Sequence, residues 1–297
     1  MGAPDAAGGA VLTRLAAISC AMAFAMAALA GCASTLNRSE TLNPASIVER
    51  DSDLARTFDH ATVLLPRGNG AMLETRMDSR ALAELVAKLP ASVRYPTVIY
   101  LHGCTGLEDV EPLRAFVRAG FAVIAPDSFA RRYRPLQCRP SQRTGGENIF
   151  VFDFRLTEIT YALHRLESIG WVDRERLFLV GTSEGGLAAA LYRGSDFRAR
   201  VITQWTCHGA ALVRGLAAPA DEPVLAVVRA NDPWYDPSRT PRQRGDCGSF
   251  MADRPRSRSI VLTDGDGHDV YRAPGMLRRI VEFLAAEANP SPRVPQN

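Results

Sequence analysis

The chain has 297 residues, of which 46% are hydrophobic and 23% are charged, and this composition argues against an intrinsically disordered protein. Its length allows one large globular domain or two small ones. The 35 basic and 32 acidic residues leave a formal net charge of only +3, without any block of five or six like charges, so the sequence gives no support for a protein that binds nucleic acid or an anionic surface.

The N-terminal segment has the pattern of an export signal. Residues 15–30 (LAAISCAMAFAMAALA) are almost wholly apolar, follow Arg14 and end in small residues. A membrane-spanning helix needs about 20 apolar residues, whereas this run is shorter and is followed by polar sequence. The pattern therefore favours a cleaved secretory signal over a spanning anchor, and we predict a signal peptide over residues 1–31.

The end of this run, Leu29-Ala30-Gly31-Cys32, resembles the lipobox of bacterial lipoproteins, in which the cysteine is acylated and the chain is cut before it. Two or three acyl chains anchor a protein stably, where a single chain is marginal. The resemblance implies an exported protein that Cys32 anchors in a bacterial membrane, the outer membrane if there is one, with the remaining chain in the periplasm. The alternative is a simple secretory signal and an unmodified Cys32. Residues 32–52 are polar and predict a tether.

The rest of the chain alternates between short apolar runs and helical patterns, up to a Pro-, Ser- and Asn-rich tail that is predicted to be disordered over 288–297. Continuous apolar runs are typical of parallel strands that are covered on both faces, and they predict strands at 97–101, 121–125, 177–180, 201–204, 224–228 and 260–263. Helical patterns are found at 79–89, 110–119, 153–169, 184–193 and 276–286. This alternation predicts an α/β domain over 53–287, with a mostly parallel central sheet flanked by helices.

A G-x-S-x-G motif follows the predicted strand 177–180 and precedes the predicted helix from residue 184. In this position Ser183 is a candidate nucleophile, because the small residues Gly181 and Gly185 allow the sharp strand-to-helix turn that presents a hydroxyl above the sheet. The N-terminus of the following helix would also direct free N–H groups toward a developing oxyanion.

A serine hydroxyl needs a base, and the base needs an acid that fixes its tautomer. Asp232 and His268 follow the predicted strands 224–228 and 260–263, at the sheet edge where α/β proteins place their sites. We prefer Asp232 over Asp236 because it comes first after its strand. The other histidines are weaker candidates for the base, since His60 and His164 do not follow strands and His208 has the character of a structural residue.

The oxyanion hole needs a second donor, from a loop after an earlier strand. The predicted strand 97–101 runs into His102-Gly103-Cys104, where glycine allows close approach of the backbone to a ligand. We predict the backbone N–H groups of Cys104 and Glu184 as oxyanion donors, with His102 holding the loop. The alternative is a glycine turn without a donor role.

These features together resemble the α/β-hydrolase superfamily, and in particular its dienelactone-hydrolase-like branch, over residues 58–286. The resemblance is carried by the His102-Gly103 turn, the segment FAVIAPDSF, the run WVDRERLFLVGTSEGG, the Asp232-Pro233 loop and Gly267-His268. It implies ester hydrolysis through an acyl-enzyme. Enzymes active on dienelactone carry a cysteine nucleophile, whereas position 183 is serine, which argues against dienelactone itself as the substrate.

Four cysteines remain after the export segment, and in an oxidising compartment they allow three pairings. We predict that Cys104 pairs with Cys138 and Cys207 with Cys247, because each bridge would tie a strand-end loop to the next long irregular segment. One bridge with two free thiols is the alternative.

Residues 128–150 form a long irregular segment rich in arginine and proline, of the kind that often serves as a lid or binding loop. Its arginines would either form a solvated face, which we favour, or attract an anionic substrate; they are Arg131, Arg132, Arg134, Arg139 and Arg143.

The leading hypothesis is a membrane-anchored serine hydrolase that cleaves a small carboxylic ester. Ser183 would attack the acyl carbonyl, His268 would act as base and then as acid, and Asp232 would orient it. This chemistry needs no cofactor, and the sequence has no Walker loop, H-E-x-x-H or paired C-x-x-C motif for a nucleotide or metal. The alternatives are a serine peptidase or acyltransferase on the same fold, and a non-catalytic binding lipoprotein.

Overall fold

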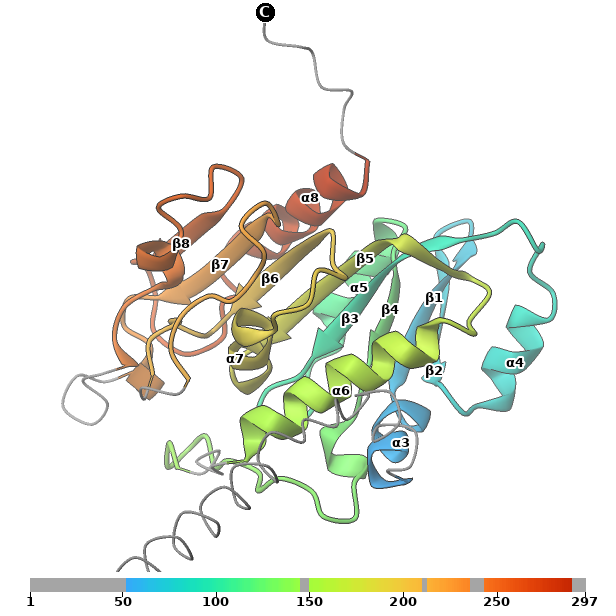
Figure 1. The fold of residues 1–297 in the computed structure, drawn as a ribbon, viewed down its shortest axis with the longest axis horizontal. Helices are drawn as coiled ribbons and strands as arrows, with labels where there is room; N and C mark the ends of the chain where they lie inside the picture. Colours follow the sequence, from blue (N-terminus) through green and yellow to red (C-terminus); the bar gives the residue numbers. More distant parts are fainter. Residues whose placement is uncertain (1–51, 145–149, 210–212, 236–242, 290–297) are drawn as a thin grey trace, which may run out of the picture. The chain divides into compact units, whose positions relative to one another are not determined.

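The computed structural model describes residues 52–144, 150–209, 213–235 and 243–289, which lie within one unit that runs from Val48 to Asn297. This part of the chain is built on an eight-stranded sheet in the order β2-β1-β4-β3-β5-β6-β7-β8 (Figure 1). The predicted signal peptide, Cys32 and nearly all of the predicted tether and tail lie outside the described residues. Within the described ranges, no helix is both long and apolar enough to cross a membrane.

The six predicted strands are confirmed, and they pair in parallel. Strands β4, β6 and β7 are buried along their whole length, so they show no alternation of apolar and polar residues. Strand β6 also buries a charged residue, Arg200. Strand β5 begins five residues earlier than predicted, in a more polar stretch. The parallel strands are β3 (Tyr95–Leu101), β4 (Ala122–Ala125), β5 (Val172–Thr182), β6 (Ala199–Thr203), β7 (Val224–Arg229) and β8 (Arg258–Leu262).

Two further strands and one helix at the start of the domain were not predicted. Strands β1 (Thr62–Gly68) and β2 (Ala71–Arg76) form an antiparallel hairpin, and β1 also pairs antiparallel with β4. The apolar run of β1 is short and ends in Pro66, so its sequence gave a weak signal. Helix α3 (Ser52–Asp59) begins at the last residue of the predicted tether.

Helices cover both faces of the sheet (Figure 1). On one face lie α3, α6 (Val151–Leu166) and α7 (Glu184–Leu191), whose apolar side chains share one core cluster with the sheet. On the other face lie α5 (Glu111–Arg118) and α8 (Met276–Ala288), which pack into a second cluster. Helix α4 (Arg80–Val86) contacts β2, and short 3-10 turns occur at Ser128–Ala130 (η1), Pro233–Tyr235 (η2) and Cys247–Phe250 (η4).

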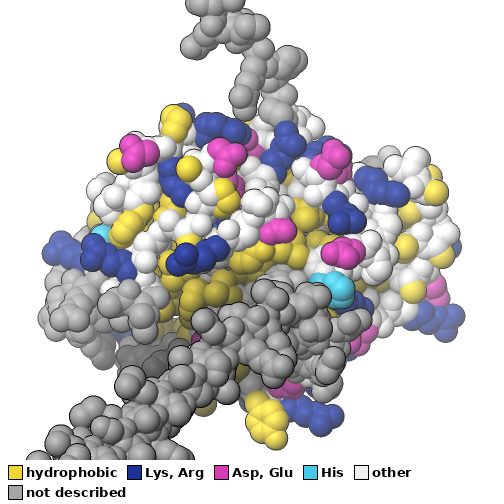
Figure 2. All heavy atoms as spheres, in the orientation of Figure 1, with side chains coloured by type: hydrophobic (Ala, Val, Ile, Leu, Met, Phe, Trp, Pro, Cys, Tyr) yellow, Lys and Arg dark blue, Asp and Glu magenta, His cyan; other side chains and the backbone are white. Residues whose placement is uncertain are grey.

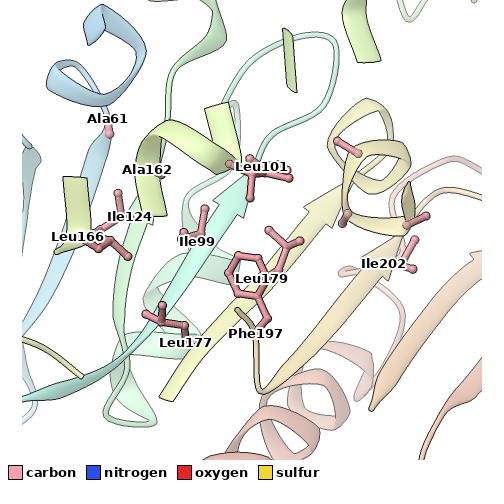
Figure 3. Packing of buried hydrophobic residues seen from close by; sticks show 14 of the residues in the cluster. Ala61, Ile99, Leu101, Ile124, Ala162, Leu166, Leu177, Leu179, Phe197 and Ile202 are labelled. Carbon is pink, nitrogen blue, oxygen red and sulfur yellow. The ribbon is translucent and has the colours of Figure 1, made fainter. Parts of the chain in front are cut away.

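The first cluster fixes the strands that carry the candidate site. Ile99, Leu101 and Leu179 are fully buried between β3, β5 and the helices above them (Figure 3). Figure 2 shows basic and acidic side chains interspersed over the face drawn there, in keeping with the near-balanced composition.

Candidate active site

Ser183 lies at a sharp turn between β5 and α7. Its backbone has φ 54° and ψ −114°, a left-handed conformation that costs a residue with a side chain about 1 kcal/mol or more. A Cβ atom added to Gly181 would lie 2.1 Å from the carbonyl oxygen of Gly185, and one added to Gly185 would lie 2.2 Å from the carbonyl oxygen of Leu101. Only glycine fits at both positions, so the strand-turn-helix context predicted for the motif is present.

A chain of hydrogen bonds connects the three residues that the sequence singled out. His268 Nε2 lies 2.8 Å from Ser183 Oγ, and His268 Nδ1 lies 2.6 Å from Asp232 Oδ2. Asp232 is buried, with 4% exposure, and its Oδ1 accepts a hydrogen bond from the backbone N–H of Trp234 at 3.0 Å. Asp236, the other candidate acid, lies outside the described residues.

The loop after β3, residues 102–106, packs directly against the nucleophile; we call it the oxyanion loop. A Cβ added to Gly103 would lie 3.4 Å from Ser183 Cβ, so the backbone that leads to Cys104 passes beside the serine. His102 is almost completely buried and holds this loop from within. Ser128 N–H donates to His102 Nε2 at 3.1 Å, so Nδ1 carries the proton and donates to Gly103 O at 2.7 Å.

The environment of His102 keeps its imidazole neutral. Burial lowers the pKa of His102 well below its usual value, and the nearby charge of Arg155 lowers it further. A neutral ring is required by the hydrogen bonds above, since Nε2 acts as an acceptor. His208 has other partners: its Nε2 lies 3.2 Å from Ser249 Oγ, and its ring packs against Phe250.

A buried ion cluster beneath the oxyanion loop was missed by the sequence analysis. It consists of Ser128, Arg131, Arg155 and Glu158, all with 6% exposure or less. The carboxylate of Glu158 accepts from Ser128 Oγ at 2.7 and 2.6 Å, from Arg155 Nη1 at 3.0 Å and from Arg131 Nε at 3.3 Å. The sequence held a signal, because Arg155 and Glu158 fall on the same helical stripe as buried apolar residues of α6.

The cluster corrects the prediction for Arg131. This arginine neither contributes to a solvated face nor is available to an anionic substrate, because it is buried and paired with Glu158. Arg132 and Arg134, which adjoin it, are exposed. Arg143 Nη1 donates to Pro233 O at 3.4 Å on the exposed surface.

Glu184, the first residue of α7, has a buried side chain in addition to the backbone N–H predicted as an oxyanion donor. The residue is 9% exposed, and neither carboxylate oxygen has a hydrogen-bond partner among the described residues. Burial raises the pKa of Glu184 to about 7; the nearby charge of Arg155 lowers it and that of Glu158 raises it. Near neutral pH the side chain therefore exists in both protonation states.

A cavity of about 220 Å³ opens beside Ser183 and His268. Its walls come from the oxyanion loop and the residues that follow it, and from Cys138, Pro140 and Trp234. Thr182, Gln204 and Tyr271 also line the cavity. Thr182 Oγ1 donates to Gln204 Oε1 at 2.5 Å, and the Tyr271 hydroxyl accepts from Thr203 Oγ1 at 3.1 Å. The cavity is small and mixed in polarity.

Two disulfides are formed, in the predicted pairing. Cys104–Cys138 ties the oxyanion loop to the irregular segment 128–144, and Cys207–Cys247 ties the segment after β6 to η4. The backbone N–H of Cys138 also donates to Cys104 O at 3.1 Å. The first disulfide therefore lies in the wall of the cavity, and both of its cysteines line it. Over the described ranges, no group of three or more His, Cys, Asp or Glu side chains is arranged to hold a metal ion.

A family model of known proteins matches the chain. Residues 83–242, just over half of the chain, match the dienelactone hydrolase family. No curated protein sequence matches the chain significantly.

Solved structures with a similar fold are distant in sequence. An acetyl xylan esterase from a Paenibacillus species has 16% identity and a TM-score of 0.48, over 65% of this chain and 74% of that one. Est1E from Butyrivibrio proteoclasticus, with bound ferulic acid, has 15% identity and a TM-score of 0.45, over 76% and 92%. A dienelactone-hydrolase-like promiscuous phosphotriesterase from metagenomic libraries has 19% identity and a TM-score of 0.44, over 62% and 75%.

Proposed function

This chain belongs to the dienelactone hydrolase family, and we propose that it is a serine esterase that cleaves small carboxylic esters through an acyl-enzyme on Ser183. The observation that carries this proposal is the continuous hydrogen-bonded chain from Ser183 Oγ through His268 to the buried carboxylate of Asp232. A serine that is hydrogen-bonded to a histidine, which an acid in turn orients, is the arrangement that activates a hydroxyl for acyl transfer.

In the first half of the reaction, Ser183 Oγ attacks the ester carbonyl carbon while His268 Nε2 takes the hydroxyl proton. The imidazolium that forms is stabilised by the Asp232 carboxylate, which is hydrogen-bonded to Nδ1. When the tetrahedral intermediate collapses, the C–O bond to the alcohol breaks and His268 returns the proton to the departing alkoxide. In the second half, water attacks the acyl-enzyme by the same route and releases the acid and free Ser183.

The negative oxygen of each intermediate needs donors, and we assign this role to the backbone N–H groups of Cys104 and Glu184. Glu184 is the first residue of α7, where N–H groups lack partners within the helix and the helix dipole favours negative charge. Support for Cys104 comes from the close packing of the preceding Gly103 on Ser183. Removal of one oxyanion donor typically costs about 10²- to 10³-fold in kcat.

The same proposal includes export and anchoring. The apolar run at residues 15–30 and the Leu29-Ala30-Gly31-Cys32 sequence support a lipoprotein whose acylated Cys32 holds the esterase domain at a bacterial membrane, on the periplasmic side. The two disulfides of the domain are in keeping with an oxidising compartment.

The esterase proposal is tested with a fluorophosphonate probe, which reacts with activated serines. Detergent-solubilised full-length protein is treated with the probe, and the adduct is located by mass spectrometry. We expect stoichiometric labelling of Ser183 that is lost in Ser183→Ala and in His268→Ala.

Ser249 provides a matched control within the same chain, because its Oγ lies 3.2 Å from His208 Nε2 and so forms a second serine-histidine pair. We expect no adduct there. If folded protein with intact disulfides fails to label at Ser183, the proposal is wrong and a non-catalytic binding protein becomes the better interpretation.

A further inference from the structure

Arg155 is a fully buried arginine that reaches from α6 to the backbone of the oxyanion loop. Its Nη2 donates to the carbonyl oxygen of His102 at 2.6 Å, and its Nη1 donates to Glu158 Oε2 at 3.0 Å. The two nitrogens are held in one rigid plane, so a guanidinium fixed by a carboxylate also fixes the carbonyl on its other branch. Glu158 therefore sets the place of Arg155, and Arg155 sets the place of the His102 carbonyl.

The His102 carbonyl lies in the oxyanion loop and next to the turn of the nucleophile. It is the last carbonyl before Gly103 and Cys104, whose backbone passes beside the nucleophile. It also lies against the turn that holds Ser183, since a Cβ added to Gly185 would come within 2.8 Å of it. A displacement of this carbonyl would move the N–H of Cys104 relative to Ser183.

The His102 ring is fixed by the same buried ion cluster. Ser128 donates its hydroxyl to Glu158 and its backbone N–H to His102 Nε2. The opposite ring nitrogen then donates to Gly103 O at 2.7 Å. Glu158 is thus connected to the oxyanion loop through Arg155, which reaches the His102 carbonyl and lies 3.4 Å from His102 Nε2, and through Ser128, which reaches the His102 ring.

Stability alone is a poor explanation for this arrangement. Burying an arginine and a glutamate is costly, and replacing a buried ion pair with well-packed apolar side chains is often neutral or stabilising. The chain contains a second such pair, Arg200–Glu222, in which a fully buried arginine donates to Ala189 O at 2.7 Å and to Tyr192 O at 2.8 Å, near the far end of α7. The Arg155–Glu158 pair holds the oxyanion loop, whereas the Arg200–Glu222 pair holds the far end of α7.

The geometry points to Arg155 as a positioning residue that holds the oxyanion loop in its catalytic conformation through the His102 carbonyl. The hydrogen bonds of Arg155 go to His102 and Glu158, so it acts by fixing the backbone that leads to the proposed donor Cys104. The inference rests on the proposed esterase function. It implies that loss of Arg155 lowers kcat, because the oxyanion donor is misplaced, while substrate binding in the ground state changes little.

The test compares Arg155→Lys and Arg155→Met with the matched control Arg200→Met, using full-length protein and 4-nitrophenyl acetate. We expect Arg155→Met to lower kcat about 10- to 100-fold with less than about a threefold change in KM. Arg155→Lys keeps a cationic donor but loses the planar guanidinium, so its kcat should lie between that of wild type and that of Arg155→Met. Arg200→Met should keep the wild-type kcat.

A transition-state analogue separates positioning from general damage to the fold. A trifluoromethyl ketone forms an oxyanion on Ser183, so its Ki should rise in the Arg155 variants by the same factor by which kcat/KM falls. If Arg155→Met fails to fold, kcat and the Ki of the ketone are both measured on Arg155→Lys.

Two results would overturn the inference but leave the proposed function standing. One is an unchanged kcat in folded Arg155 variants of an active enzyme, and the other is a loss of kcat in Arg200→Met equal to that in Arg155→Met. A wild-type protein without Ser183-dependent turnover would overturn the proposed function, and the inference with it.

Discussion

The backbone N–H of Glu184 is a proposed oxyanion donor. Its side chain is a buried carboxyl group that has no hydrogen-bond partner in the described ranges. The charged groups that act on this carboxyl are Arg155 and Glu158. Burial dominates and raises its pKa from 4.5 to about 7. The folded protein thus retains a proton that the unfolded chain releases at lower pH.

The sign of the effect on stability follows from this difference. Below pH 4.5 the carboxyl is protonated in both states, and its contribution to stability is fully present. As the pH rises from 4.5 to about 7, only the folded state keeps the proton, so the free energy of unfolding decreases. A shift of this size corresponds to about 3 kcal/mol, lost by pH 7 to 8.

We predict that Glu184→Gln removes this pH dependence. As the pH rises from 4.5 to 8, the unfolding free energy of the variant should increase relative to that of wild type. Urea unfolding of both proteins across this range measures the difference, and a parallel pair of curves would contradict the raised pKa. Glu175→Gln, at an exposed site on β5, is the control and should follow wild type.

At the scale of elements, the site is formed by four loops that leave the same edge of the sheet. Ser183 follows β5, Asp232 follows β7, His268 follows β8 and the oxyanion loop follows β3. Parallel strands in register bring these ends together, and the remaining freedom lies in the loops. Cys104–Cys138 limits that freedom for the oxyanion loop.

We predict that the two disulfides affect stability alike but activity differently. They close loops of 34 and 40 residues, so removal of either should cost up to about 4 kcal/mol. The double variant Cys104→Ser/Cys138→Ser should also lose kcat, because both cysteines line the cavity beside Ser183. Cys207→Ser/Cys247→Ser serves as the matched control. Thermal unfolding and ester turnover of both variants measure the effects, and equal kcat values would contradict the prediction.

At the scale of the whole molecule, the domain is an α/β-hydrolase domain with its own core on each face of the sheet. The proposed membrane anchor, Cys32, lies outside the described residues. If Cys32 is acylated as proposed, it would carry two or three acyl chains, and each buried CH₂ would contribute about 0.8 kcal/mol to membrane affinity.

We predict that Cys32→Ser abolishes acylation and moves the protein from the membrane to the soluble fraction when it is produced in a bacterium. Metabolic labelling with an alkynyl fatty acid, followed by fractionation, measures both properties. Kinetic constants of the released domain should match those of wild type in detergent. Label that persists in Cys32→Ser would show that another residue carries the lipid.

The sequence alone determined the strand-helix alternation, the nucleophile motif and the order Ser183, Asp232, His268, because each is a local pattern that needs no knowledge of distant contacts. It also led to the disulfide pairing, since each cysteine pair joins segments that the topology brings together. The edge hairpin β1–β2 escaped prediction because its apolar run is short and broken by Pro66.

Only the tertiary structure decided the state of the charged residues. In the sequence, Arg131 is one of five arginines in an irregular segment and Arg155 belongs to an ordinary helix. In the fold, both arginines pair with Glu158, and Arg155 also reaches the oxyanion loop through the His102 carbonyl, although the two arginines lie 24 positions apart in the sequence. For Arg155 and Glu158, three positions apart on α6, the helical stripe was a local signal of burial. The burial of Arg131 depends on a partner 27 positions away, and no local pattern indicates which carboxylate will pair with it.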